Sequence, residues 1–383
     1  MSRKLRVLHV ISSLEEGGAA KGAVELVGGL NASGEVDARL CVLGTNHRSV
    51  PTDRIPGGVK FLDSPVGRRS LKLRRWRQLR DIANEFRPDI VHSHLWPTAV
   101  DVSWALLGKS LPHVIHVRDS PEAFAERRWQ SVLKKRLTAA AIRLNRPRPR
   151  LVAVSQAAAD YTALHLRLPA DQIQVLLNAV DLTEFVDTPL ERPARADGRI
   201  VIGAAGRLVE PKGHRYLVEA VIRLRSEGLP VSLQIIGTGN QREALERQCL
   251  ESGHPDAVTI MDYRPDVHRF YEQLDIYVLP SVSAEGLSRS LIEAMASGRP
   301  IVATDCEGTR EVVRDQQDGL IVPVRDSAAL AGAIRAIASD LPRRHRLGLS
   351  GRERAVKAFS IERVIREVIQ LYRDFVAGLR TVR

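Results

Sequence analysis

The chain has 383 residues, of which 44% are hydrophobic, and a net charge of +12. A chain of this length is too long for one typical hydrophobic core, so two domains are expected. No apolar run approaches the roughly 20 residues that cross a bilayer, which excludes a membrane-spanning helix. The first residues lead into a strand rather than a secretory signal, and the three cysteines are scattered without metal-ligand spacing, so a cytoplasmic protein with reduced thiols is expected.

The positive charge is concentrated in the first half of the chain. Residues 1–190 carry 28 Lys and Arg against 19 Asp and Glu. Such an excess indicates a polyanionic partner, which could be nucleic acid, an anionic bilayer or a phosphorylated substrate. Charge alone does not choose among these three.

The first predicted strand covers residues 5–11 and is followed by the diglycine Gly17-Gly18 and an amphipathic helix pattern over residues 23–30. Glycines in a strand-to-helix loop let the backbone approach a bound group, and helix N–H groups can then face a phosphate. The alternative is a flexible loop with a glycine cap. The loop lacks G-x-G-x-x-G, so it does not indicate a dinucleotide site.

Further short apolar strands are predicted at residues 39–43, 90–92, 114–117 and 151–154. Their alternation with helices argues for a parallel sheet that is covered on both faces. Two basic segments that contain tryptophan lie between them. Tryptophan beside arginines is typical of a helix on an anionic membrane surface, and a solvated surface helix is the alternative. The residues expected at this membrane or acceptor surface are Arg74, Arg75, Trp76, Arg77, Arg127, Arg128 and Trp129.

Histidines follow two of the apolar runs, as His92-Ser93-His94 and as His116. Residues beyond the carboxyl ends of strands line the ligand crevice of an open α/β sheet, so these histidines are candidate ligand contacts. A hydrogen-bonded structural histidine is the alternative. The His-x-His pair has no third ligand at a motif spacing, so no metal site is predicted.

Residues 186–199 contain two prolines and no periodicity, and they are the predicted linker. The linker separates an N-terminal domain, residues 1–185, from a second domain, residues 200–359. The second domain opens with a strand and with Gly206-Arg207, followed by Lys212-Gly213. Arg and Lys five residues apart across a glycine-rich bend can converge on one diphosphate, because Arg gives forked hydrogen bonds and Lys a mobile charge.

The stretch 281–300 contains two carboxylates eight positions apart, Glu285 and Glu293, on either side of a predicted helix start. Free N–H groups at a helix start form an anion site. Carboxylates at two depths along the same element can hold the hydroxyls of two polyols. The stretch therefore outlines a site for a nucleoside diphosphate linked to a sugar.

These motifs resemble those of retaining glycosyltransferases of family 4 (glycosyl transferases group 1). Glu285-x7-Glu293 resembles the E-x7-E signature of that family, and Gly206-Arg207 with Lys212-Gly213 resembles its phosphate loop. The resemblance implies an α/β fold of GT-B architecture, with two Rossmann-like doubly wound parallel-sheet domains facing a cleft. It also implies that the C-terminal helix, residues 360–383, packs back on the N-terminal domain.

The resemblance assigns roles to residues in both domains. His116 and Glu285 are expected to contact the transferred sugar, and Glu293 the ribose. Arg207 and Lys212 would neutralise the diphosphate, so no metal and no cofactor are expected; with His116 and Glu285 they form the implied catalytic set. The implied donor-binding set is Gly18, Gly206, Arg207, Lys212, Gly237, Tyr263, Arg264, Glu285, Gly286, Leu287, Ser288 and Glu293.

The implied activity is transfer of a sugar, with retention of anomeric configuration, from a nucleoside-diphosphate sugar. A UDP-sugar is the expected donor, and a lipid-linked or polysaccharide acceptor of bacterial surface-glycan synthesis the expected acceptor. The enzyme would be cytoplasmic and peripheral on the inner face of the cytoplasmic membrane. A GT-B epimerase or hydrolase and a basic, non-catalytic nucleic-acid-binding protein are the alternatives, although nucleic acid is not an expected partner.

Overall fold

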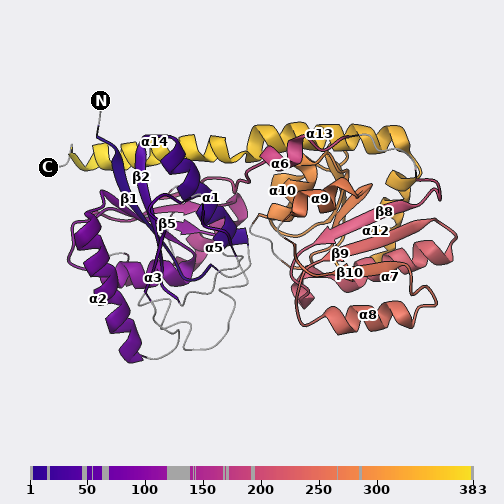
Figure 1. Cartoon of the computed structure of the whole chain (residues 1–383), viewed down its shortest axis with the longest axis horizontal. Coiled ribbons are helices and arrows are strands. Elements are labelled where there is room, and N and C mark those ends of the chain that lie inside the picture. Colours follow the sequence, from indigo (N-terminus) through magenta and orange to yellow (C-terminus); the bar gives the residue numbers. More distant parts are fainter. Residues whose placement is uncertain are drawn as a thin grey trace. The chain divides into compact units, whose positions relative to one another are not determined.

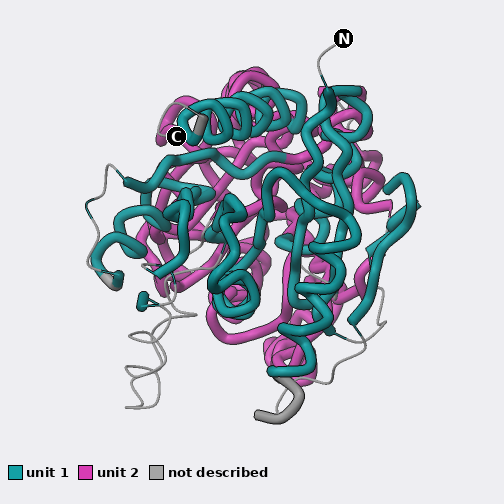
Figure 2. Tube along the Cα trace, turned by 90° about the vertical axis from the view of Figure 1, so that its left-hand side faces the viewer, with its two compact units in different colours: residues 1–179, 361–383 teal, residues 180–360 magenta. Residues whose placement is uncertain are grey.

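The structure is a computed structural model that describes residues 3–14, 18–44, 50–53, 55–62, 69–118, 139–140, 142, 144–166, 169, 172–190, 195–264, 266–283 and 287–380. The chain divides into two compact units, drawn in two colours in Figure 2. Unit 1 comprises residues 1–179 and 361–383, and unit 2 comprises residues 180–360.

Unit 1 is built on a seven-stranded sheet in which every neighbouring pair of strands runs parallel. The strand order is β3-β2-β1-β4-β5-β6-β7, so the chain builds outward from β1 and then reverses at β4. Strands β1, β2 and β5 of this sheet are labelled in Figure 1. The parallel sheet predicted from short apolar strands is thereby confirmed. The strands are β1 (Leu5–Ile11), β2 (Val36–Val42), β3 (Val59–Phe61), β4 (Ile90–His94), β5 (His113–Val117), β6 (Arg150–Ala153) and β7 (Ile173–Val175).

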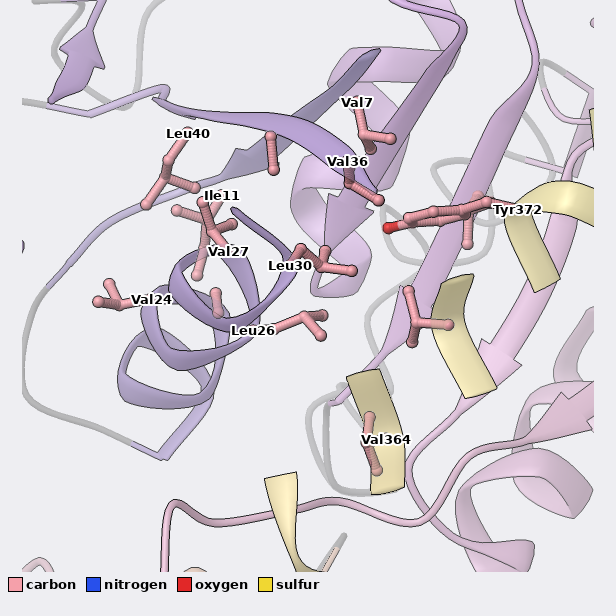
Figure 3. Packing of buried hydrophobic residues seen from close by; sticks show 14 of the residues in the cluster. Val7, Ile11, Val24, Leu26, Val27, Leu30, Val36, Leu40, Val364 and Tyr372 are labelled. Atoms are coloured by element: carbon pink, nitrogen blue, oxygen red, sulfur yellow. The ribbon is translucent and has the colours of Figure 1, made fainter. Parts of the chain in front are cut away.

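Helices cover both faces of this sheet. Side chains alternate between the two faces of a strand, so Val7 and Ile11 of β1 enter the core with α1 and α14, part of which is drawn in Figure 3. Leu8 and Val10 enter the opposite core with α2 and α3. The helices of unit 1 are α1 (Gly18–Ala32), α2 (Arg69–Phe86), α3 (Trp96–Ala105), α5 (Gln156–Leu166) and α14 (Ile361–Arg380).

Helix α14 returns from the end of the chain to pack in unit 1. Its Val368 and Tyr372 are fully buried in the same core as α1. The two helices approach closely, since a Cβ added at Gly29 of α1 would lie 2.1 Å from Cδ1 of Ile365.

Unit 2 repeats the plan with six parallel strands in the order β10-β9-β8-β11-β12-β13. The strands are β8 (Ile200–Ala205), β9 (Val231–Ile236), β10 (Val258–Met261), β11 (Ile276–Leu279), β12 (Ile301–Thr304) and β13 (Gly319–Val322). Helix α7 packs with α12, and α10 packs with α13. The helices are α6 (Thr183–Val186), η3 (Glu210–Lys212), α7 (His214–Ser226), α8 (Arg242–Leu250), α9 (Val267–Glu272), α10 (Arg289–Ala296), α11 (Thr309–Val312), α12 (Ser327–Ala338) and α13 (Leu341–Phe359).

The boundary between the units differs from the predicted linker at residues 186–199. The units divide between Ala179 and Val180, and the first residues of unit 2 are held within it. The guanidinium of Arg299 donates to the carbonyl of Pro189, and that of Arg352 donates to the carbonyl of Thr188. The carbonyls of Thr188 and Pro189, within the predicted linker, are therefore bonded inside unit 2, and residues 191–194 lie outside the described residues.

Candidate functional site

Each sheet has one place where the strand order reverses, between β1 and β4 in unit 1 and between β8 and β11 in unit 2. Loops from the two central strands leave toward opposite faces there, so ligands of open α/β sheets bind beyond the carboxyl ends of these strands. Of the residues that the sequence predicts as sugar and phosphate contacts, Arg207 and Lys212 follow β8, at the reversal in unit 2. His116 does not lie beyond a strand end, as the sequence suggested, but within β5 itself.

In unit 2, the loop after β8 carries both predicted phosphate-binding cations. Arg207 is exposed to solvent, and Lys212 is half-buried at the end of the short helix η3. The backbone N–H of Val282, in the loop after β11, donates to the carbonyl of Pro211 at 2.9 Å. The loop with the two cations is therefore fixed to the segment that leads into α10.

Gly213 makes this contact between the two loops possible. Its φ is +64°, in the left-handed region that disfavours side chains, and a Cβ there would lie 2.1 Å from the carbonyl oxygen of Pro280. A second close approach joins Gly206 to Gly237, because a Cβ at Gly237 would lie 1.9 Å from the carbonyl oxygen of Gly206. Gly213 and Gly237 thus allow the loops after β8, β9 and β11 to approach one another closely. Of these two glycines, only Gly237 belongs to the predicted donor-binding set.

Glu293, the second carboxylate of the predicted signature, is buried inside unit 2. Its Oε2 accepts a hydrogen bond of 3.0 Å from the hydroxyl of Tyr271, and its Oε1 lies 3.7 Å from the guanidinium of Arg289. Burial, followed by the charge of Glu293, raises the pKa of Tyr271 well above its usual value, so the phenol remains a donor. Arg289 precedes Glu293 by one helical turn on α10, a spacing that the sequence shows. The contact with Tyr271 was not visible from the sequence, because that residue belongs to another helix, α9.

The other predicted donor-site residues have different surroundings. Leu287 and Ser288 are buried at the start of α10, and Tyr263 is exposed. Arg264 donates to both carboxylate oxygens of Asp266, at 2.7 and 2.6 Å, and this pairing lowers the pKa of Asp266 to about 2. A nucleotide base would therefore have to share Arg264 with a carboxylate. Residues 284–286, which include Glu285 and Gly286, lie outside the described residues, whereas Gly18 is the first residue of α1.

In unit 1, four fully buried histidines meet on one face of the sheet. His9 pairs with His92 in the register of β1 and β4, and His94 pairs with His116 in that of β4 and β5. The rings of His9 and His92 lie stacked with their centroids 4.8 Å apart. Tyr372 of α14 extends toward the strands with its hydroxyl leading (Figure 3), and that hydroxyl is hydrogen-bonded to Nδ1 of His92 at 2.5 Å.

Burial keeps these imidazoles neutral. It lowers the pKa of His9 to about 3, with a smaller contribution from the positive charge of Arg118. Burial also lowers the pKa of His92, His94 and His116 well below the usual value. Ring nitrogens of His9, His92 and His94 lie within 4.8 Å of one another, a set that could hold a metal ion. The third donor comes from β1, more than 80 residues away in sequence, where no spacing argument finds it.

His9 and Tyr372 are the residues of this cluster that the sequence predictions missed. The signal for His9 was a polar residue in the middle of a strand that is otherwise apolar on both faces. The signal for Tyr372 was a hydroxyl in the apolar stripe of a helix. Both are visible only when the partner strands are known, because each residue alone is compatible with an ordinary core position.

Only part of the predicted membrane or acceptor surface on the basic helix α2 is exposed. Arg74 and Arg77 are exposed, but Arg75 is buried and donates to Asp101 of α3 at 2.9 Å. The indole of Trp76 donates to the same carboxylate, also at 2.9 Å. These two side chains therefore anchor α2 on α3; Arg75 is buried and Trp76 is half-buried. Arg127, Arg128 and Trp129 lie outside the described residues. Within the described part of the chain, no helix is both long and apolar enough to cross a membrane.

Family models match both units of the chain. One described as "Glycosyltransferase Family 4" matches residues 16–184, and one described as "Glycosyl transferases group 1" matches residues 199–340. The two matches lie on either side of the boundary region and together cover most of the chain. The resemblance inferred from the glutamate spacing and the phosphate loop is confirmed.

Two curated proteins illustrate the similarity. The lipopolysaccharide core biosynthesis glycosyltransferase LpsE of Rhizobium meliloti (strain 1021) is 34% identical over 193 residues, 50% of this chain and 53% of that protein. The putative colanic acid biosynthesis glycosyltransferase WcaL of Escherichia coli (strain K12) is 31% identical over 175 residues, 44% of this chain and 42% of that protein. The chain thus spans about half the length of these relatives.

Among solved structures, Anabaena Alr3699/HepE in complex with UDP and glucose superposes with a TM-score of 0.79. The match covers 96% of this chain and 99% of that chain at 19% identity. At this identity the likeness concerns the fold alone. With the two parallel sheets, it confirms the predicted GT-B architecture of two Rossmann-like domains.

The contact at Gly213 predicts an unequal effect of two glycine substitutions. Gly198 has the same φ of +64°, but a Cβ added there would have no atom within 4 Å. We expect Gly198→Ala to cost only the left-handed strain, about 1–2 kcal/mol. Gly213→Ala should lower the free energy of unfolding by roughly 3–5 kcal/mol, because it also drives the two loops apart. Urea unfolding followed by circular dichroism measures both, and equal losses would contradict the packing described.

The buried histidines predict that stability falls as the pH drops below about 6.5. An unfolded histidine takes up a proton near pH 6.5, whereas His9 and His113 remain neutral until about pH 3 in the folded chain, because burial lowers the pKa of both. The unfolded state then binds more protons, so each such histidine costs up to about 1.4 kcal/mol per pH unit. All four tryptophans lie in residues 1–179, so their fluorescence during urea unfolding reports on unit 1.

The window from pH 6.5 to 5 separates the histidines from carboxylates, which titrate near pH 4 in the unfolded chain. His113→Asn should reduce the slope of the free energy of unfolding against pH by up to about 1.4 kcal/mol per pH unit, the contribution of one proton. A free energy of unfolding that is constant from pH 7 to pH 5 would show that the histidines are protonated in the folded state.

Proposed function

We propose that this chain, which belongs to the family 4, group 1 glycosyltransferases, transfers a sugar from a nucleoside-diphosphate sugar to a lipid-linked or polysaccharide acceptor. The observation that carries the proposal is the bond between Val282 and Pro211, which fixes the loop of Arg207 and Lys212 beside the segment leading into α10. Cations and a helix start on adjacent loops at a strand reversal suit a diphosphate. UDP is the nucleotide we propose, because it is the one named with the superposed Anabaena protein.

The proposed chemistry assigns the leaving group to unit 2. Arg207 and Lys212 bind the diphosphate and stabilise the negative charge that develops on it as the bond to the sugar breaks. Glu293, held by Tyr271, accepts hydrogen bonds from the ribose, and Glu285 accepts one from a sugar hydroxyl. Two cations at this position supply the charge that a metal ion would otherwise provide, so we propose a metal-independent enzyme.

The proposed stereochemistry is retention. The acceptor hydroxyl attacks the face of the sugar from which the diphosphate departs, and a phosphate oxygen takes the proton of that hydroxyl. His116 is the residue that we propose to contact the transferred sugar, through its Nε2, which is buried in this structure and has no partner among the described residues. The anomeric configuration of the product, read by NMR spectroscopy immediately after transfer, distinguishes this course from inversion.

Donor binding is tested by thermal shift with UDP, GDP and ADP. A ligand at 100 times its dissociation constant stabilises the native state by about 2.7 kcal/mol, and we expect UDP to give the largest shift. Lys212→Ala should weaken binding about tenfold or more, since it removes a charge-assisted hydrogen bond. Lys357→Ala is the matched control, because Lys357 is an exposed lysine elsewhere in unit 2.

Two results would contradict the assignment. If Lys212→Ala shows the full thermal shift with UDP, the diphosphate does not bind at this loop. Conversion of a UDP-sugar at the same rate with and without acceptor would identify an epimerase or hydrolase instead of a transferase.

If the acceptor is linked to a lipid, the enzyme must reach a membrane. We therefore expect unit 1 to bind anionic membranes through α2. Arg74 and Arg77 are exposed there beside Leu73, whose exposed fraction is 66%. A basic residue near an anionic bilayer contributes about 1 kcal/mol. Joint Arg74→Glu and Arg77→Glu should therefore weaken binding to phosphatidylglycerol vesicles by about 2 kcal/mol or more, roughly 30-fold, without unfolding the chain.

The control for this variant changes the net charge of unit 1 equally at other exposed positions, Lys4→Glu with Arg366→Glu. Vesicle flotation measures binding of both variants. If both lose binding equally, the interaction follows net charge and not α2. If neither loses binding, the membrane surface lies elsewhere in the chain.

A further inference from the structure

The buried histidines and Tyr372 form one unbranched chain of hydrogen bonds, which we call the histidine relay. Nε2 of His94 lies 3.0 Å from Nδ1 of His9, and Nε2 of His9 lies 3.4 Å from the hydroxyl of Tyr372. The same hydroxyl lies 2.5 Å from Nδ1 of His92, and Nε2 of His92 lies 3.2 Å from Nδ1 of His116. The two ends, Nδ1 of His94 and Nε2 of His116, are buried and have no partner among the described residues.

The number of hydrogen atoms determines how this chain can be arranged. A neutral imidazole has one N–H donor and one nitrogen acceptor, and a phenol has one O–H donor. If Nε2 of His94 donates to His9, then Nε2 of His9 donates to Tyr372, the phenol donates to His92, and Nε2 of His92 donates to His116. All four histidines then carry their proton on Nε2. The opposite direction places every proton on Nδ1.

We propose that the histidine relay couples the tautomers of all four histidines and so sets whether Nε2 of His116 donates or accepts toward the transferred sugar. In this arrangement His9, His92, His94 and Tyr372 are positioning residues, and they act only through His116. The inference rests on the proposed function for the role of His116, but the coupling of tautomers does not.

The two directions are connected by a balanced proton shift. One proton leaves Nε2 of His116, each of the four bridging protons crosses its own hydrogen bond, and one proton enters at Nδ1 of His94. No charge remains on the relay, which suits a fully buried site. His116 therefore changes from donor to acceptor only together with the Tyr372 hydroxyl, 256 positions away along the chain.

The arrangement favours a relay over a metal site. Both nitrogens of His9 and of His92 already face a partner within the chain of hydrogen bonds. Histidines that bind metal usually donate their second nitrogen to a carboxylate or a carbonyl, and no described carboxylate is bonded to these four. The nearby charge of Arg118, which adds to burial in lowering the pKa of His94 and His116, also opposes a cation here.

The tautomers are measured directly in the protein with ¹⁵N-labelled histidine, by long-range proton–nitrogen correlation. We expect one shared tautomer for His9, His92, His94 and His116 in the wild-type chain. Tyr372→Phe keeps the buried ring but removes the hydroxyl, so it should separate the relay into two pairs, His94 with His9 and His92 with His116. His113 is the internal control, because it is bonded to Ser93 outside the relay and should keep its tautomer.

The consequence for turnover is tested on the same variant. Tyr372→Phe should lower kcat about tenfold or more and leave the thermal shift with UDP unchanged, because the nucleotide site lies in unit 2. Absence of transfer by the wild-type chain would refute the proposed function and leave the tautomer measurement valid. Mixed tautomers in the wild-type chain would overturn the relay without any variant.

Two further outcomes would overturn the proposal. If Tyr372→Phe folds and retains both the shared tautomer and the wild-type kcat, the hydroxyl links nothing. If addition of Zn²⁺ raises the Tm of the wild-type chain but not of His94→Gln, the histidines form a metal site. Neither result is expected from the hydrogen bonds described.

Discussion

Both units depend on the same topological constraint, a fully parallel sheet whose strand order reverses between two central strands. Loops that leave β8 and β11 diverge, and the gap between them would be open without further contacts. The Val282–Pro211 hydrogen bond and the absence of a Cβ at Gly213 bring these loops together. In unit 1, neutral imidazoles lie within the strands at and next to the reversal, β1, β4 and β5. The same reversal therefore positions cations and backbone in one unit, and uncharged donors and acceptors in the other.

The histidine cluster follows from the register of the sheet. Because side chains alternate along a strand, His92 and His94 lie on the same face of β4, and the paired positions in β1 and β5 add His9 and His116 to that face. Buried polar groups destabilise a core unless they are hydrogen-bonded. The imidazoles bond to one another in two pairs, and the hydroxyl of Tyr372 joins these pairs. The protein thus contains a polar network within a hydrophobic core.

The sequence predicted the fold and the motif residues of unit 2 better than the contacts that hold them. The alternation of apolar strands with helices is a local pattern, which can be recognised from the sequence alone. The same is true of the spacing of Arg207 and Lys212 and of the two glutamates. Arg75 and Trp76 suggested a membrane helix because their common partner, Asp101, lies 25 or more residues away. His9 appeared as part of an apolar strand for the same reason. Predictions failed where the partner of a polar side chain belongs to another element, since periodicity describes one element at a time.

The histidine cluster of unit 1 is complete only once the last helix, α14, has packed in that unit. His9 and Tyr372 are 363 positions apart, so unit 1 is completed only after residues 180–360 have been inserted between its parts. The entropy of closing a loop grows only as the logarithm of its length, and a loop of 360 residues costs roughly 3 kcal/mol more than one of 10. Helix α14 buries its own side chains Val368, Tyr372 and Phe375. Burial of one such side chain contributes about 1.5–3 kcal/mol to the free energy of unfolding. Burial of these apolar surfaces outweighs the closure cost, and the helix that supplies it also carries the hydroxyl that joins the histidine pairs.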